Sequence, residues 1–380
     1  MAESVVTHDW DVVRTAGTAR AAVIPAPGHA AEVHDLPLPE LETDSAFLHV
    51  ELSEVCGTDV HLRAGRLSGV PYPLIPGHVS VGRLAEIRGT LKDVHGRVLH
   101  EGERVTFLDV HRTCNACWHC LVAKATTRCP HRRVYGITYG AVDGLAGGWA
   151  EALYLKPGTR IIPLDGVDPE TFMAGGCSLP TALHGIDRAD ILMGDTALVL
   201  GAGPVGLSSV VLARMRGAGT VLCVGAPTAR LATAGALGAA DTLDFTACSE
   251  ADRREWVLER TGGRGADVTI EATGAPQAVV DAMRCTRDAG RVVVLGQYTD
   301  HGDVAFNPHA DLNRKHLDIR GVWGSDYSHF HRAVELLRDP ERARAWEPLV
   351  LERYSLADAN RALDLVAEGA VIKALIDPAL

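Results

Sequence analysis

The sequence has 380 residues, of which 22% are charged and 47% hydrophobic, and its formal net charge is -11. A chain longer than the ~250 to 300 residues at which one hydrophobic core stops growing is expected to form two domains. Because it has no basic block and no apolar run near the ~18 residues of a membrane span, we expect no nucleic-acid or membrane partner and a cytoplasmic protein.

The first part of the chain predicts a β-rich domain. Residues 1–18 are polar and irregular, and are expected to form a loose N-terminal extension. From there to about residue 160, short runs rich in Val, Leu and Ile are broken every ~8 to 12 residues by Gly or Pro, which is typical of an all-β module. The clearest runs are "FLHVELSEV", "VSVGRLAEI", "ERVTFLDV" and "AEALYL".

After about residue 180 the pattern changes to apolar strands that alternate with alanine-rich helices. The strands "TALVLG", "TVLCVG", "ADVTIEATG" and "RVVVLG" are separated by segments such as "PVGLSSVVLARMRG". This alternation predicts parallel βαβ units and an α/β fold. Two amphipathic helices, "HFHRAVELLRD" and "LADANRALDLVAEG", and a last strand, "VIKALID", are expected near the end.

A glycine-rich turn follows the strand "ALVLG". It contains Gly201, Gly203 and Gly206, with Pro204 and Val205 between the last two. The first glycine permits a tight turn, the second lets the backbone approach a pyrophosphate, and the third lets helix and strand pack closely. Since a strand precedes the turn and a helix follows it, dinucleotide binding is favoured over a purely structural turn.

The end of the second strand of this domain bears on the choice between NAD and NADP. An acid that binds the ribose hydroxyls is expected about 20 residues after the glycines, but the position holds Gly225. Without that carboxylate a 2'-phosphate meets no repulsion, and Thr228 or Arg230 could donate to it. We therefore expect NAD(P), with NADP slightly favoured, unless Arg230 merely covers the flank of its helix.

Four of the nine cysteines form the segment "CNACWHCLVAKATTRC", with the spacing C-x2-C-x2-C-x8-C. Closely spaced thiolates of this kind can close a tetrahedral shell around a structural zinc, with no open position for chemistry. An iron–sulfur cluster shares the first spacings, but its fourth ligand usually follows after only three residues. Zinc is therefore favoured over iron at Cys114, Cys117, Cys120 and Cys129.

Three further residues are candidates for a second metal site. Cys56 in "EVCGTDVHLRAG", His78 in "PGHVSVG" and Cys177 in "GGCSLPTALHG" are isolated in sequence, where a buried thiol or a hydrogen-bonded histidine is the ordinary interpretation. In a chain with a dinucleotide site they suggest a Cys, His, Cys shell. Three protein ligands leave one position for water or substrate, as a catalytic zinc requires.

Taken together, the motifs resemble those of the zinc-dependent alcohol dehydrogenases of the medium-chain dehydrogenase/reductase superfamily. The resemblance begins near residue 19 and rests on "CGTD" at 56–59, "PGH" at 76–78, "GERV" at 102–105, the four cysteines, "GGWAE" at 147–151, Cys177 with Thr181, "GAGPVG" at 201–206, "GRVVVLG" at 290–296 and "VIKALI". It implies a GroES-like β-barrel catalytic domain, residues 19–180 and 316–380, into which a Rossmann domain, residues 181–315, is inserted.

The resemblance also implies two zinc ions per chain. The catalytic zinc would be bound by Cys56, His78 and Cys177, and the structural zinc by the four clustered cysteines. Many relatives carry a glutamate directly after this histidine, where the present chain has Val79. We therefore expect a shell of three protein ligands and one water or substrate oxygen, without an acid from position 79.

The remaining implied roles concern the proton and the cofactor. Thr58 and His61 correspond to a proton relay, although His61 could also be an ordinary solvated histidine. Asp59 is expected to bind the far nitrogen of His78, with a turn cap as the alternative. The positions implied to contact the cofactor are Thr181 and Gly296 beside the nicotinamide, and Lys373 at the pyrophosphate.

The expected function is hydride transfer between the carbon of an alcohol, or of its carbonyl product, and NAD(P). Asp109, His111 and Arg112 lie near where the family lines its pocket, which weakly favours a polar or anionic substrate unless they are solvated loop residues. The resemblance implies a homodimer or homotetramer.

Two other functions stay open from the sequence. A zinc-free reductase of the same superfamily, acting on an enone or quinone, generally lacks the catalytic cysteine and histidine. A non-catalytic nucleotide-binding sensor would keep only the structural metal. Two zinc ions per chain would support the dehydrogenase and one would support either rival. A zinc-ribbon nucleic-acid module is disfavoured by the acidic balance.

Overall fold

The structure, a computed structural model, describes residues 3–380, with side chains from Trp10 onward. These residues form two compact units. The first unit ends at Gly176 and resumes at Asp326–Arg338 and Leu351–Leu380, and the second comprises Cys177–Ser325 and Asp339–Val350. The Rossmann domain expected at residues 181–315 lies inside the second unit, which extends beyond both of those ends.

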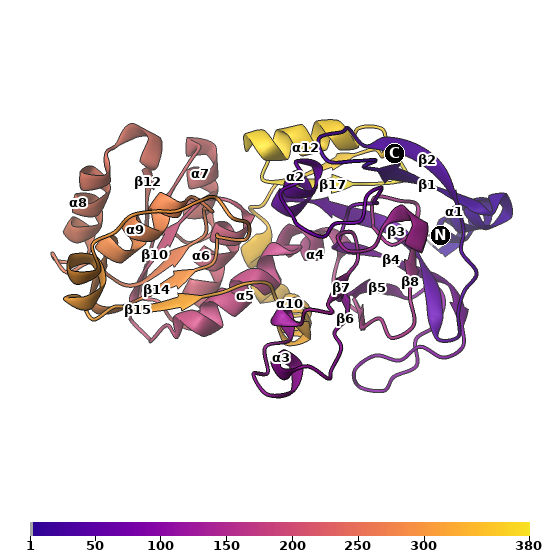
Figure 1. The fold of residues 1–380 in the computed structure, drawn as a ribbon, viewed down its shortest axis with the longest axis horizontal. Helices are drawn as coiled ribbons and strands as arrows, with labels where there is room; N and C mark the ends of the chain where they lie inside the picture. Colours follow the sequence, from indigo (N-terminus) through magenta and orange to yellow (C-terminus); the bar gives the residue numbers. More distant parts are fainter. Residues whose placement is uncertain (1–2) are drawn as a thin grey trace. The chain divides into compact units, whose positions relative to one another are not determined.

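The first unit is built on a seven-stranded sheet in which only β16 and β17 pair in parallel. Strands β3, β4, β5, β8 and β17 of this sheet are labelled in Figure 1. The strand order in this sheet is β16-β17-β3-β4-β5-β9, and β8 also pairs with β3. Two further sheets have two strands each, β1 with β2 and β6 with β7. The strands are β1 Thr18–Val23, β2 Glu32–Pro37, β3 Ser45–Val55, β4 Ser80–Arg88, β5 Arg104–Phe107, β6 Val110–Arg112, β7 Arg133–Val134, β8 Ala152–Leu155, β9 Ile161–Pro163, β16 Leu351–Tyr354 and β17 Lys373–Ile376. The four runs quoted from the sequence therefore contain strands, as predicted.

The N-terminal segment corrects one expectation. Residues 3–16 form a helix and not a loose leader, whereas residues 1 and 2 lie outside the described part. Trp10 and Val13 are three residues apart, hence on one helix face, and each is 7% exposed in the core that also contains Phe47. The sequence did not predict this helix because its few apolar residues are surrounded by polar ones. The helices of the first unit are α1 Glu3–Ala16, α2 Gly57–Arg63, α3 Trp118–Leu121, η1 Thr126–Arg128, η2 Ala141–Asp143, α4 Pro169–Gly175, α10 Tyr327–Leu337 and α12 Ala359–Glu368.

The second unit is a parallel sheet with the strand order β12-β11-β10-β13-β14-β15 (Figure 1). This is the 3-2-1-4-5-6 order of dinucleotide-binding folds, and it reverses between β10 and β13. The strands are β10 Thr196–Leu200, β11 Thr220–Gly225, β12 Asp241–Asp244, β13 Ala266–Glu271, β14 Thr286–Val294 and β15 Asp318–Gly321. Strand β15, "DIRG", is mostly exposed and lacks an apolar run, which explains why the sequence did not place it in this sheet.

Most helices of the second unit connect successive strands of this sheet, whereas the first of them precedes β10 and the last two follow β15. The helices of this unit are α5 Ser178–Ala189, α6 Pro204–Arg216, α7 Thr228–Ala236, η3 Phe245–Ala247, α8 Glu250–Arg260, α9 Pro276–Cys285, the π-helical turn η4 Pro308–Asn313, α11 Pro340–Ala343 and η5 Arg344–Trp346. Helix α6 contacts α5 and α7, whereas α8 contacts α9. Among the described residues, no helix has both the length and the apolar character needed to cross a membrane.

Candidate active site and metal centres

The glycine-rich turn joins β10 to α6 where the strand order reverses. Gly201 has a φ of 113°, a conformation that favours glycine. A Cβ on Gly206 would lie 1.9 Å from the carbonyl oxygen of Gly201, so glycine is required for this close packing. A Cβ on Gly203 would meet nothing within 4 Å, which leaves space beside the N-terminus of α6. The turn thus has the shape that a pyrophosphate requires, with Pro204 as the first helical residue.

Gly225 ends β11 beside this turn. A Cβ there would lie 2.6 Å from the Cβ of Ala202, so close packing, and not only cofactor choice, calls for glycine. Asp244 is paired in register with Gly225, and its carboxylate accepts a hydrogen bond from Oγ1 of Thr228 at 3.1 Å. Thr228 therefore donates to an acid that the sequence pattern missed. Burial lowers the pKa of Arg230, which lies in the first turn of α7.

Glu271 is a candidate site residue that sequence reasoning missed. It ends β13 at the carboxyl edge of the parallel sheet, where such folds bind ligands, and its side chain is fully buried. Its Oε1 accepts hydrogen bonds from the backbone N–H of Thr273 at 2.7 Å and of Gly274 at 3.0 Å, and Oε2 accepts one from the N–H of Gly296 at 3.2 Å. One carboxylate therefore fixes the loops after two neighbouring strands. The sequence signal was only an acid at the end of an apolar strand.

Substitution of Glu271 by glutamine tests this role. The amide group would face backbone N–H donors, so we expect the free energy of unfolding to fall by about 1 to 3 kcal/mol. The KM for the cofactor should also rise, because Gly296 is expected to lie beside the nicotinamide. Chemical denaturation and cofactor titration measure the two effects. Glu255→Gln, at an exposed position of α8, is the matched control, and equal behaviour of both variants would contradict the prediction.

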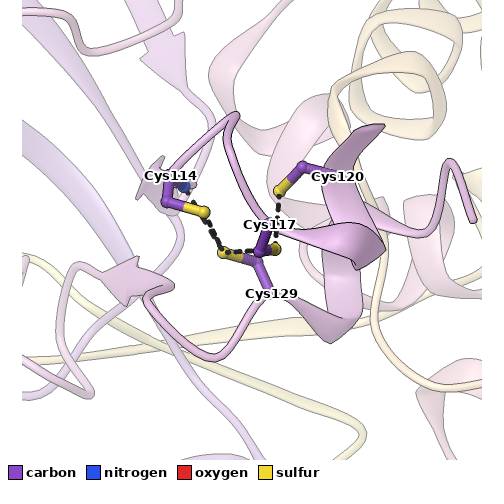
Figure 2. Close-up of side chains that lie close together, drawn as sticks. All are labelled: Cys114, Cys117, Cys120 and Cys129. Carbon is purple, nitrogen blue, oxygen red and sulfur yellow. Dashed lines mark hydrogen bonds between the residues drawn. The ribbon is translucent and has the colours of Figure 1, made fainter. Parts of the chain in front are cut away.

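The four clustered cysteines lie in the segment of the chain between β6 and β7, and their sulfur atoms come close together (Figure 2). The Sγ of Cys117 lies 3.6 Å from that of Cys120 and 4.0 Å from that of Cys129, and the Sγ atoms of Cys129 and Cys114 are 3.6 Å apart. Zinc–sulfur bonds of ~2.3 Å in a tetrahedron require sulfurs about 3.8 Å apart. The cluster therefore fits a zinc ion. Cys129 belongs to the cluster although eight residues separate it from Cys120.

The electrostatics of this cluster also suit a cation. The pKa of Cys114 is lowered to about 6, chiefly by a hydrogen bond from the backbone N–H of Ala116. Burial raises the pKa of the Cys120 thiol to about 11. The lowered pKa of Cys114 favours a thiolate that attracts a divalent cation, and a bound cation would in turn favour loss of the proton from Cys120.

Cys56, His78 and Cys177 come from three separate segments of the chain. Cys56 follows β3, His78 precedes β4, and Cys177 precedes α5. Their ligand atoms all lie within 4.8 Å of one another, and no carboxylate of the described residues belongs to the group. Val79 is fully buried, and His78 is 6% exposed. Two thiols and an imidazole at this spacing fit a zinc ion with one open position.

Helix α2 begins directly after Cys56 and supports this site. The backbone N–H of Thr58 donates to the Sγ of Cys56 at 3.3 Å. The carboxylate of Asp59 accepts from the N–H of Cys56 at 2.9 Å and from that of Gly77 at 3.4 Å, which links two ligand-bearing segments. Burial raises the pKa of Asp59, and the nearby His78 opposes this rise. Asp59 is thus a helix cap, while its bond to the far nitrogen of His78 stays a prediction.

Two residues expected to meet ligands are engaged elsewhere. Lys373 is 1% exposed, and its ammonium group donates to the carboxylate of Glu54, while its contact with a pyrophosphate stays a prediction. His111 is 8% exposed, with Nδ1 2.5 Å from the hydroxyl of Tyr139 and Nε2 3.0 Å from the carbonyl oxygen of Pro157. Both ring nitrogens of His111 are therefore used within the protein, so this histidine does not indicate a polar substrate.

The other predicted residues lie on the elements that flank these sites. His61 is partly buried on α2, three residues after Thr58 and so on the same helix face. The hydroxyl of Thr181, in the first turn of α5, donates to the carbonyl oxygen of Cys177 at 2.8 Å. Asp109 is partly buried before β6, and Arg112 is exposed at its end.

Comparison with known proteins agrees with this geometry. Residues 42–166 match the model of the alcohol dehydrogenase GroES-like domain, and residues 204–339 match that of the zinc-binding dehydrogenases. The 5-exo-hydroxycamphor dehydrogenase of Pseudomonas putida is 32% identical over 365 residues, which span 95% of this chain and 99% of that protein. The chain belongs to the zinc-binding alcohol dehydrogenases. As a member of this family it is an oxidoreductase with a GroES-like and a Rossmann-type domain, as predicted.

Solved structures of this family share the whole fold. An alcohol dehydrogenase from Thermotoga maritima matches with a TM-score of 0.88 and 31% identity, covering 95% of this chain and 99% of that one. A protein of Sinorhizobium meliloti 1021, described as a zinc-binding dehydrogenase bound to NADP, matches with a TM-score of 0.81 and 27% identity. The match covers 95% of this chain and 99% of that one. These relatives support the dehydrogenase over the zinc-free reductase and the sensor.

Proposed function

We propose that the chain transfers hydride between the carbon of a small alcohol and NAD(P), with a zinc ion bound by Cys56, His78 and Cys177 at the reacting centre. The observation that carries this proposal is the convergence of the three ligand atoms within 4.8 Å of one another, without a carboxylate from the described residues. When bound, the zinc ion would act as a Lewis acid that lowers the pKa of the alcohol oxygen.

The chain's own residues would move the proton and orient the cofactor. The hydroxyl of Thr58 would accept the alcohol proton, and His61, on the same face of α2, would take the proton onward. His61 would then release the proton to solvent. Thr181 and Gly296 would orient the nicotinamide, whose C4 accepts or gives the hydride.

A second zinc ion is proposed for the four-cysteine loop, where it would be structural. Four protein ligands leave no position for a substrate. The sulfur separations of 3.6 to 4.0 Å support this assignment. We therefore propose two zinc ions per chain.

A panel of alcohols and carbonyls, tested with NAD and with NADP, tests the function. The panel includes 5-exo-hydroxycamphor, after the Pseudomonas relative, and a linear polyol, which tests the polar substrate predicted from the sequence. The absorbance of the reduced nicotinamide reports turnover. We expect turnover of at least one alcohol, while a two-zinc protein inactive on every compound would contradict the proposal. Cofactor binding without turnover in a one-zinc protein would favour the sensor.

We further propose that NADP is the preferred cofactor. Gly225 leaves the end of β11 without a carboxylate, and Arg230 offers a cation nearby in the first turn of α7. The Sinorhizobium relative bound to NADP is consistent with this preference. Asp244 acts against it, because a carboxylate beside Gly225 repels a 2'-phosphate.

Substitution of Arg230 by glutamine is expected to raise the KM for NADP about 10- to 100-fold, because a charge-assisted hydrogen bond contributes ~1.5 to 3 kcal/mol. The KM for NAD should stay nearly constant and serves as the internal control. Asp244→Asn should act in the opposite direction and lower the KM for NADP. Steady-state kinetics with both cofactors measure these changes. A parallel loss with NAD and NADP would show that Arg230 only packs against its helix.

The chain is also proposed to act in the cytoplasm as a homodimer or homotetramer. None of its nine cysteines, all within the described residues, forms a disulfide, which suits a reducing compartment. In the four-cysteine loop, Trp118, Leu121 and Val122 are 63%, 52% and 64% exposed, and adjacent apolar side chains of this kind often mark a protein interface. Light scattering would give the molar mass.

A further inference from the structure

A fully buried ion pair lies in the first unit between β17 and β3. The ammonium group of Lys373 donates to Oε1 of Glu54, and both side chains are 1% exposed. The strands are antiparallel, with Leu375 opposite Glu54. Because side chains two residues apart share one face of a strand, Lys373 is a diagonal neighbour of Glu54 on that face.

The ion pair lies beside two segments that end in candidate metal ligands. Glu54 precedes Cys56 by two residues, and the pairing of Ala374 with Val55 places Lys373 next to Cys56 across the ladder. The ammonium group also donates to the carbonyl oxygen of Gly175, at the end of α4, at 3.3 Å. The pair thus connects the strand that leads to Cys56 with the helix end before Cys177.

Gly176 shows how tightly the second segment is held. It has a φ of 47°, and a Cβ there would lie 2.3 Å from Oε2 of Glu54 and 2.8 Å from Nζ of Lys373. The backbone just before Cys177 therefore rests directly on the ion pair. Small shifts of either charged side chain would move the residue that follows Gly176.

This buried ion pair is not well explained as a means of stabilising the fold. Replacing a buried ion pair by apolar residues is often neutral or stabilising, because desolvation of two charges costs about as much as their attraction returns. Directional bonds to a carboxylate and to a helix-end carbonyl do, however, fix the relative positions of the segments that they join. The pair is therefore better suited to positioning than to stabilising.

We infer that Glu54 and Lys373 are positioning residues that hold Cys56 and Cys177 at the separation needed for metal binding. This inference rests on the proposed zinc at Cys56, His78 and Cys177. It also assigns Lys373 a role at the metal site in place of the pyrophosphate contact expected from the sequence.

The test compares zinc retention in three variants, Glu54→Gln, Lys373→Met and the double variant. Zinc per chain is followed during dialysis against a chelator, and the four-cysteine site serves as the internal reference. Removal of groups that orient metal ligands typically weakens metal binding about 10- to 100-fold. Each single variant and the double variant should lose the catalytic zinc faster by that order, because each lacks the bond between Lys373 and Glu54. Lys315→Met is the control, because it removes a partly buried ammonium, bonded to the carbonyl oxygens of Met283 and Thr286 in the second unit.

Three results would overturn the inference. The first is unchanged zinc retention in both single variants while Lys373→Met weakens only cofactor binding, as the pyrophosphate role requires. The second is zinc loss in Lys315→Met equal to that in the test variants. If Lys373→Met does not fold, the isosteric variant Glu54→Gln decides the test alone. The third result is then that Glu54→Gln retains zinc as well as the wild-type protein does. A wild-type protein that holds zinc only in the four-cysteine loop would instead refute the proposed function.

Discussion

Substitution of Cys177 by serine is expected to lower kcat/KM for alcohol oxidation by about a thousandfold and to release one of the two zinc ions. A serine hydroxyl stays protonated near neutral pH, whereas a thiolate is the form that binds zinc. Lewis-acid stabilisation contributes several kcal/mol, and each ~1.4 kcal/mol is a factor of ten in rate. Steady-state kinetics and metal analysis of the same preparation measure both effects.

Cys248→Ser is the matched control for this substitution. Its thiol lies in the second unit, where Sγ donates to the carbonyl oxygen of Asp244 at 3.3 Å, and it belongs to neither metal group among the described residues. We expect both zinc ions and full activity in this variant. If Cys177→Ser kept two zinc ions and a similar rate, Cys177 would not be a ligand of the catalytic zinc.

Substitution of Cys129 by serine is expected to remove the structural zinc and to lower the midpoint of thermal unfolding by about 10 °C. Structural zinc sites bind with ~10 to 16 kcal/mol in isolated peptides. Loss of even ~4 kcal/mol of this, at about 2 to 4 °C per kcal/mol for domains of this size, gives a shift of that order. Differential scanning calorimetry and metal analysis measure the change.

The Cys129 variant should keep its catalytic zinc and its initial turnover at moderate temperature, because the two metal sites have no ligand in common. Cys248→Ser again provides the control with a wild-type midpoint. A Cys129 variant with two zinc ions would show that the four-cysteine site closes without this residue, and that the 3.6 Å approach of its Sγ to that of Cys114 is incidental.

Much of the fold could be predicted because its signals are periodic or conformational. Alternation of strands and helices indicated the parallel sheet, and the requirements for glycine at Gly201 and Gly206 are visible in the sequence. The helix at residues 3–16 was missed because its buried face is reduced to isolated apolar residues among polar ones. Strand β15 was missed because an exposed edge strand needs no apolar run.

The candidate site was predictable where residue type dictates chemistry. Cysteines and a histidine are the preferred ligands of zinc, so the sequence identified both groups that the structure brings together. Partners of charged residues were not predictable, because a lysine or an acid takes its role from distant segments. Lys373 meets Glu54 across two strands, and Glu271 meets the loop at Gly296.

The central claim, that zinc at Cys56, His78 and Cys177 is needed for alcohol oxidation, is tested most directly by following turnover during stepwise zinc removal. Zinc content and the rate of NAD(P) reduction with an active alcohol are measured in the same samples before and after chelation, and again after zinc is restored. We predict that turnover falls in proportion to the loss of one zinc ion per chain and returns with it. Full turnover after that zinc has left would contradict the claim.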